Sequence, residues 1–189
     1  MSATASPRQE ELLDGLVELF LAEGFQRFTL ADLANHLHCS KTSLYGLGHS
    51  KESVMLNVLA RFFRRATEEV EERAGAESEP SARIVAYLRA VADELRPASA
   101  QFITDVAAHP AARAVYERNT RIAAERVSAM IAEGVRVGAF RKVHAVFAAD
   151  LIAATMTRIQ SGEVNRHTGL SDAVAYDDLA DLVLNGIAN

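Results

Sequence analysis

The sequence is poor in several residue types, and each shortage excludes a class of protein. Its single cysteine, Cys39, rules out an internal disulfide and a zinc site built from cysteines. No apolar run is long enough to span a bilayer. The first fifteen residues are polar and acidic, unlike a secretory signal peptide. We therefore expect a cytoplasmic protein that does not enter a membrane.

Positive charge is also scarce. The 189 residues carry 20 Lys and Arg against 25 Asp and Glu, which gives a formal net charge of −5, whereas nucleic-acid-binding domains are often basic. Residues 1–65 hold seven side chains of each sign, so the excess of negative charge lies in the rest of the chain. A neutral N-terminal segment is compatible with DNA binding if its cations gather on one face.

Helix-breaking residues are scarce as well. Only four prolines interrupt the sequence, apolar residues recur at three- and four-residue spacing, and no alternating pattern typical of strands persists. We predict an all-α fold of about nine helices. Its parts are a small domain over residues 1–50, a connecting helix from 51 to about 73, a linker over 75–81, and a helical domain over 81–189. The other helices are expected at residues 7–23, 81–95, 98–108, 110–137, 144–161 and 171–187. Two short helices are expected after Thr29 and Ser40, and the second of them should end near residue 47.

Residues 29–52 predict a helix-turn-helix followed by the start of a long helix. Thr29, Ser40 and Ser50 are suited to cap the three helix N-termini. The apolar residues that hold the first two helices at a fixed angle are Leu30, Leu33, Leu37, Cys39 and Leu44. The open side of the second helix carries Lys41, Thr42, Ser43 and Tyr45. An apolar inner side with polar outer side chains is typical of a helix that enters the DNA major groove.

Four short motifs follow one another at fixed spacing in this part of the chain. They are LFLAEGF at 19–25, TLADLA at 29–34, HCSKTSLY at 38–45 and SKESV at 50–54. The pattern resembles that of the TetR family of transcriptional regulators, in which a helix-turn-helix precedes a helical effector-binding and dimerisation domain. The resemblance implies that the residues contacting DNA are Thr29, Ser40, Lys41, Thr42, Ser43, Tyr45, His49 and Lys51.

The same stretch departs from the family pattern at three positions. His38 stands in place of the turn glycine, where a left-handed backbone is expected. Leu47 and Gly48 replace an aromatic or histidine residue and a buried phenylalanine. His49 is expected to offer a polar contact from that loop. Ordinary structural explanations remain open, because the hydroxyl residues cap helices in any protein and Tyr45 can belong partly to the core.

Aromatic and methionine side chains recur at inward spacing in the remaining helices. The resemblance implies that such residues line a cavity for an effector, expected to be a small apolar or amphipathic molecule. The candidates are Phe62, Tyr87, Phe102, Tyr116, Met130, Phe147 and Met156. For each of them the alternative is plain core packing.

The last two expected helices, 144–161 and 171–187, are rich in alanine and apolar residues, which permit close approach between helices. The resemblance implies that this pair meets its copy in a four-helix bundle. The resulting homodimer would present two recognition helices to a palindromic double-stranded operator.

No constellation typical of an enzyme occurs in the sequence. The histidines are scattered, and neither a nucleophile–base pattern nor a glycine-rich phosphate loop is present. We therefore predict no metal, no cofactor and no enzymatic activity. The leading hypothesis is a dimeric repressor that a ligand releases from DNA. The alternative is a helical small-molecule-binding or interaction protein that no longer binds DNA.

Overall fold

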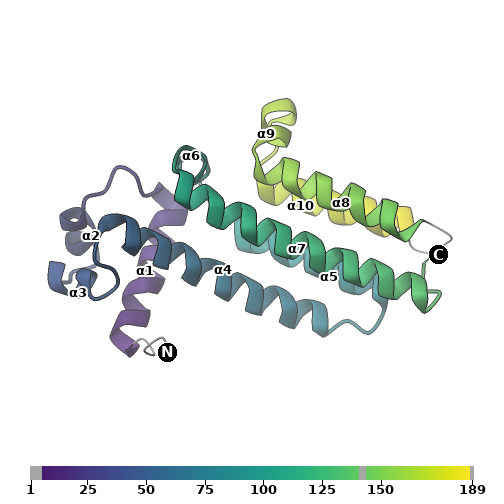
Figure 1. Ribbon diagram of the computed structural model, residues 1–189, viewed down its shortest axis with the longest axis horizontal. Helices are drawn as coiled ribbons and strands as arrows, with labels where there is room; N and C mark the ends of the chain where they lie inside the picture. Colours follow the sequence, from purple (N-terminus) through teal and green to yellow (C-terminus); the bar gives the residue numbers. More distant parts are fainter. Residues whose placement is uncertain (1–5, 141–143, 188–189) are drawn as a thin grey trace. The chain divides into compact units, whose positions relative to one another are not determined.

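The structure is a computed structural model in which residues 6–140 and 144–187 are described. These residues form ten α-helices (Figure 1), which confirms the predicted all-α fold. In chain order the helices are α1 (Pro7–Glu23), α2 (Leu30–His36), α3 (Lys41–Tyr45), α4 (Lys51–Gly75), α5 (Pro80–Leu95), α6 (Ala100–Ala108), α7 (Pro110–Arg136), α8 (Ala145–Gln160), α9 (Glu163–Thr168) and α10 (Asp172–Ile187).

Local hydrogen bonds set the ends of α1 where the sequence predicts them. The Ser6 hydroxyl accepts a bond from the Gln9 backbone N–H at 3.3 Å, and the Ser6 N–H donates to Gln9 Oε1 at 2.8 Å. This reciprocal pair is a capping box. Pro7 fills the first helical position, where a missing N–H costs nothing. The helix stops before Gly24, whose φ of 75° is accessible to glycine at little cost.

Two short helices differ from the prediction. α3 ends at Tyr45 instead of near residue 47, because the Leu47 N–H bonds back to the Leu44 carbonyl at 2.9 Å and the Leu47 side chain is buried. The sequence pattern does not predict α9. Its six residues lie between Gly162 and Gly169, both left-handed, and are too few to show a helical period.

Packing divides the chain into two compact units. Unit 1 combines the described part of residues 1–65 with residues 97–115, and unit 2 combines residues 66–96 with the described part of 116–189. α6 therefore belongs to the same unit as α1, α2 and α3, although it follows α5 in the chain. α4 and α7 each contribute residues to both units.

Phenylalanine rings meet within the otherwise largely aliphatic core of unit 1. The Phe25 ring is 1% exposed, and its centroid lies 5.6 Å from that of Phe20 in α1 and 6.4 Å from that of Phe102 in α6. Nearer the surface, Arg61 of α4 donates to both oxygens of Asp14 in α1, at 2.8 and 2.9 Å. These hydrogen bonds hold the pKa of Asp14 below its usual value. The pair ties α1 to α4.

The core of unit 2 is largely aliphatic and is built from α5, α7, α8 and α10. Its most deeply buried large side chains are Ile84, Leu88, Ile131, Met156 and Ile159. α10 packs along α5 and beside α8 (Figure 1). Arg126 of α7 clamps Glu71 of α4 with hydrogen bonds as short as 2.8 Å. None of the helices in residues 6–140 and 144–187 is both long and apolar enough to cross a bilayer.

Candidate nucleic-acid interface

α2, the turn after it and α3 form the predicted helix-turn-helix, and two leucines fix its geometry. Leu33 of α2 and Leu44 of α3 are 1% and 0% exposed. Burying each of them stabilises the motif by roughly 2 kcal/mol relative to leaving it in water. Leu30, Leu37 and Cys39 are only half-buried. The apolar contact between the helices is therefore narrower than the sequence suggested.

The turn between α2 and α3 depends on the backbone of His38. Its φ of 49° is the one positive value for a non-glycine residue in the described part of the chain, as its place in the motif predicts. The following N–H, that of Cys39, donates to the Ala34 carbonyl at 2.9 Å and closes the end of α2. A residue with a β-carbon pays about 1 kcal/mol or more for this conformation, so the turn is mildly strained.

Thr29 caps α2 as predicted, but its hydroxyl is already engaged. Thr29 Oγ1 accepts a bond from the Asp32 N–H at 3.2 Å and donates to Asp32 Oδ2 at 2.7 Å. The Thr29 N–H donates to the same carboxylate at 2.8 Å, and this backbone bond is the main reason why the pKa of Asp32 lies below its usual value. A phosphate that accepts from Thr29 must compete with Asp32.

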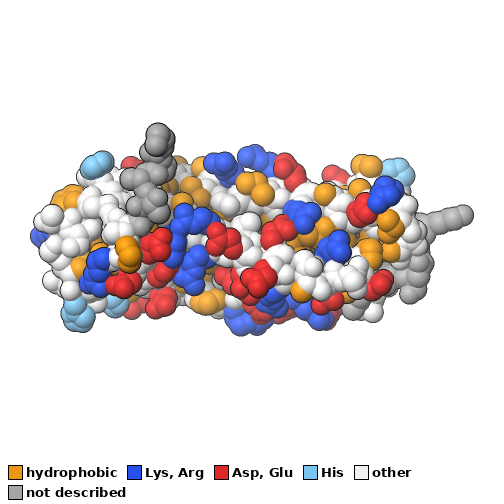
Figure 2. Space-filling view, turned by 90° about the horizontal axis from the view of Figure 1, so that it is seen from below, with side chains coloured by type: hydrophobic (Ala, Val, Ile, Leu, Met, Phe, Trp, Pro, Cys, Tyr) orange, Lys and Arg blue, Asp and Glu red, His pale blue; other side chains and the backbone are white. Residues whose placement is uncertain are grey.

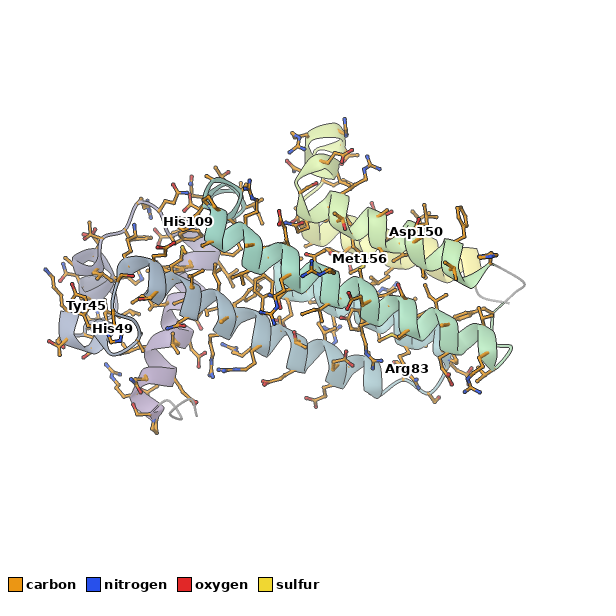
Figure 3. The ribbon with its side chains drawn as sticks, in the orientation of Figure 1. Tyr45, His49, Arg83, His109, Asp150 and Met156 are labelled. Carbon is orange, nitrogen blue, oxygen red and sulfur yellow. The ribbon has the colours of Figure 1, made fainter. Side chains whose placement is uncertain are left out.

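The outer side of α3 is open. Ser40 caps the helix through a 3.0 Å bond from the Ser43 N–H, and the two hydroxyl oxygens lie 2.9 Å apart. Lys41 and Thr42 are exposed on the first turn. Tyr45, at the C-terminal end of α3, is 49% exposed (Figure 3). Its ring is therefore available for contact as well as for packing.

The turn after α3 packs around a different residue from the family pattern. Leu47 is 6% exposed, and the Asn57 side-chain amide donates to its carbonyl at 2.6 Å. A β-carbon added at Gly48 would lie only 2.6 Å from Ser53 Oγ, so a larger residue does not fit there. The apolar anchor of this turn is thus Leu47, one position before the usual phenylalanine. His49 follows it and is exposed (Figure 3).

Lys51 begins α4, and the loop between α1 and α2 holds its ammonium group. Lys51 Nζ donates to the Gln26 carbonyl at 2.7 Å. The same loop is bound by Asp105 of α6, whose carboxylate accepts from the Phe25 and Gln26 N–H groups at 2.6 and 2.8 Å. Sequence reasoning misses both partners. An aspartate three residues after Phe102, on the apolar side of its helix, was a detectable signal of a buried polar role.

Charge on this part of the surface is mixed. The exposed Lys41 and Lys51 share it with the exposed Asp32 and Glu52. Figure 2 shows one face of the molecule, on which cationic and anionic side chains alternate without a continuous basic field. Opposite charges in similar numbers give this surface little net positive potential.

The seven candidate ligand-binding residues lie in three different environments, namely the core of unit 1, the surface of α8 and the core of unit 2. Phe62 and Phe102 lie in the core of unit 1, with ring centroids 6.4 Å apart. Phe147 is 66% exposed on α8. The four buried in unit 2 are Tyr87, Tyr116, Met130 and Met156. Unit 2 therefore gathers the largest share of the set.

A buried carboxylate accompanies the tyrosines of unit 2, and sequence reasoning assigned it no role. Asp172, 8% exposed at the start of α10, accepts a bond from the Tyr116 hydroxyl at 3.2 Å. Burial raises the pKa of Asp172 to about 6 and that of Tyr87 to about 12. Within the described residues, no three His, Cys, Asp or Glu side chains gather into a possible metal site.

Unit 2 also has a surface groove of about 570 Å³, formed by the end of α4, the following loop and α5. Its charged walls include Arg73 and Arg89. Each arginine is already paired, Arg73 with Asp93 and Arg89 with Asp181, at 2.7 Å in both cases. The groove therefore offers no unopposed positive charge to an anionic ligand.

Large apolar side chains are exposed on two neighbouring helices of unit 2. They are Val146, Phe147 and Leu151 of α8 and Val174 and Leu182 of α10. Three of them, Val146, Phe147 and Leu182, are more than 60% exposed. Exposed large apolar side chains that lie close together mark a surface that another molecule covers more often than one that stays in water.

No protein-family profile and no curated protein matches the sequence. Solved structures do match the fold. A transcriptional regulator from Saccharomonospora viridis, solved in complex with choline, is 18% identical, with a TM-score of 0.74 over 98% of this chain and 100% of that one. A TetR-family regulator from Thermus thermophilus is 21% identical, with a TM-score of 0.61 over 93% and 97% of the two chains. A TetR/AcrR-family regulator from Thermobifida fusca is also 21% identical, with a TM-score of 0.64 over 96% and 98%. These likenesses extend over nearly the whole chain, and the protein has the fold of the TetR-family transcriptional regulators.

Proposed function

We propose that the protein is a dimeric transcriptional regulator that binds a specific DNA operator through α3. The observation that carries the proposal is the contrast between the two sides of this helix, since Leu44 is fully buried while the opposite side is polar and open. The polar residues of α3 and its cap are Ser40, Lys41, Thr42, Ser43 and Tyr45. A helix held in this way can offer side chains to base edges in the major groove.

The start of α4 supplies the proposed contacts to the DNA backbone. α4 has 25 residues, so its N-terminus carries a partial positive charge that favours a phosphate. Ser50 caps it, and Lys51 adds a full charge at its first position. One of the three ammonium N–H groups of Lys51 is used by Gln26, which leaves two for a phosphate. Thr29 and His49 would complete the edge of the contact.

The exposed apolar residues of α8 and α10 support a homodimer. We propose that this surface packs on the same surface of a second copy, as symmetric interfaces require. Two copies of α3 would then contact successive major grooves of a palindromic operator. Pairing also doubles the number of phosphate contacts, which offsets the weak positive charge of one chain.

We propose that a small apolar or amphipathic ligand binds in unit 2 and releases the DNA, so that the protein acts as a repressor. The buried aromatic and methionine side chains of unit 2 favour such a ligand. The Saccharomonospora viridis regulator was solved in complex with choline, a small quaternary ammonium cation of the kind that aromatic side chains can bind. Release requires tighter ligand binding to the conformation that fits the operator poorly. Shifting the population from 99:1 to 1:99 takes about 5.5 kcal/mol of differential affinity.

The test begins with in-vitro selection of an operator from random duplexes, followed by fluorescence anisotropy with the selected sequence. Lys41→Ala and Thr42→Ala should weaken binding to the selected operator, and a lost base contact costs about 1–3 kcal/mol. Arg121→Ala removes an exposed cation of unit 2 and serves as the control. Equal loss in all three variants would argue against recognition through α3.

The alternative function, a ligand-binding or interaction protein without DNA binding, is favoured by the acidic net charge and by the engagement of Thr29 with Asp32. The two functions differ in the outcome of the selection. A protein that enriches no duplex at low salt, yet shows thermal stabilisation by apolar ligands, would support the alternative.

A further inference from the structure

Asp105 of α6 has a buried carboxylate that accepts hydrogen bonds from the loop between α1 and α2. It is 3% exposed, and its Oδ2 atom accepts from the N–H groups of Phe25 and Gln26 at 2.6 and 2.8 Å. Gln101, one turn earlier in α6, donates to the other oxygen at 2.7 Å. The Gln26 side chain donates to the Asp105 backbone carbonyl at 3.2 Å. Four hydrogen bonds therefore orient the carboxylate and the loop together.

The loop is shaped to receive this carboxylate. Gly24 has a φ of 75°, and a β-carbon there would lie 2.5 Å from Asp105 Oδ2, so only glycine leaves the necessary space. The next residue, Phe25, is 1% exposed, and its ring centroid lies 6.4 Å from that of Phe102 and 6.2 Å from that of His109. The backbone of the loop is thus fixed on the side that faces α6.

The other side of the loop holds the cation that begins α4. The Gln26 carbonyl accepts a hydrogen bond from Lys51 Nζ at 2.7 Å. A lysine side chain has four flexible bonds and loses up to about 2 kcal/mol of conformational entropy when it is fixed. A carbonyl that holds the ammonium group in advance removes part of that cost from any later contact. Gln26 is therefore a link between Asp105 and Lys51.

We propose that Asp105 is a positioning residue for DNA binding, which acts through Gln26 to hold the Lys51 ammonium group against a phosphate. The inference rests on the proposed DNA-binding function and extends it to a residue of α6, some fifty positions beyond the helix-turn-helix. Asp105 itself does not touch DNA. Its loss frees the loop, and the charge of Lys51 then contributes less to the complex.

The salt dependence of operator binding tests this role, because it counts phosphate contacts. Each phosphate neutralised contributes about 0.9 to the slope of log K against log salt. Lys51→Ala should therefore reduce the slope by about 0.9 per subunit, or about 1.8 for a dimer. Asp105→Ala should also reduce this slope. The variant that combines Lys51→Ala with Asp105→Ala should have the same slope as Lys51→Ala alone.

Two further variants separate this role from general effects. Asp105→Asn should keep the wild-type slope, because the Asn oxygen can accept from both loop N–H groups and its amide can donate to a rotated Gln101 side chain. Thr104→Ala changes the neighbouring exposed residue of α6, whose hydroxyl bonds only within the helix, and should also keep it. Removing a negative charge would by itself strengthen DNA binding. Weaker operator binding by Asp105→Ala therefore cannot result from the change in net charge.

Circular dichroism checks that each variant is folded. If Asp105→Ala does not fold, Gln101→Ala replaces it as the test variant, and a smaller reduction of the slope is expected. An unchanged slope in a folded Asp105→Ala protein would overturn the inference while leaving the proposed function intact. Additive reductions in the double variant would overturn it as well. Absence of salt-dependent operator binding by the wild-type protein would instead overturn the proposed function, and this role with it.

Discussion

At the scale of single residues, His38 adopts an unfavourable backbone conformation, and the sequence motif predicts it. It occupies the left-handed turn position with a φ of 49° and an exposed side chain. We expect His38→Gly to raise the free energy of unfolding by up to about 1 kcal/mol, since glycine adopts this conformation without the β-carbon clash. Urea denaturation measures the change.

A matched control lies two residues earlier. His36 is also exposed but has helical backbone in the last turn of α2, so His36→Gly should destabilise the protein by roughly 0.5–1 kcal/mol. The two substitutions are therefore expected to have opposite signs. A loss of stability in both would show that the turn does not strain His38.

Burial makes the charged form of Asp172 unfavourable in the folded protein. Its pKa is raised from 3.8 to about 6, so folding favours the protonated form. The contribution to stability is fully present below the unfolded pKa and is lost as the pH rises through about 6. Asp172→Asn removes this dependence. The stability of the variant relative to the wild type should therefore grow by about 1.4 kcal/mol between about pH 5 and about pH 7.5.

Denaturation curves at several pH values test this prediction, and Asp178→Asn is the control on the same helix. Asp178 is exposed, so its replacement shows the effect of removing a carboxylate from this helix without changing the core. A stability difference between Asp172→Asn and the wild type that does not change with pH would mean that the Asp172 carboxylate is better solvated in solution than its position in the core indicates.

At the scale of helices, local chemistry explains what the sequence predicted correctly. The ends of α1 and the start of α2 follow from capping residues within three positions of the helix end, such as Ser6 with Gln9 and Thr29 with Asp32. Such signals need no knowledge of the fold. The same holds for the left-handed turn at His38, which the motif places by spacing alone.

The errors at this scale arise from contacts between distant segments. The length of α3 depends on Leu47 being buried, with its carbonyl bound by Asn57 ten residues later. The bonds from Phe25 and Gln26 to Asp105 join residues about eighty positions apart. Periodicity indicates that Asp105 faces inward, but it does not reveal the partner. The placement of the ligand candidates, including the exposed Phe147, likewise depends on how helices pack.

At the scale of the whole molecule, the proposed dimer depends on the apolar surface of α8 and α10. Leu151 is 56% exposed near the middle of α8. Leu151→Asp should place two charges in the symmetric interface, and an unpaired buried charge is costly enough to dissociate most dimers. We expect the variant to be monomeric by size-exclusion chromatography with light scattering, and to bind the operator much more weakly than the wild type.

Ile122→Asp provides the comparison for the dimer. Ile122 is 47% exposed on α7, outside the proposed surface, so this variant should remain dimeric. A wild-type protein that is monomeric at micromolar concentration would contradict the proposed interface. If Ile122→Asp dissociates the dimer and Leu151→Asp does not, the interface is formed by α7 instead of by α8 and α10.

The interleaving of the two units limits how this chain can be cut or recombined. A fragment that ends at residue 65 contains the whole helix-turn-helix, yet it leaves Phe25 without Phe102 and two loop N–H groups without Asp105. A chimera built to transfer the proposed DNA specificity must therefore include residues 97–115 as well. The unit that contains the helix-turn-helix is therefore discontinuous in the sequence, and it extends beyond the motif from which the helix-turn-helix is predicted.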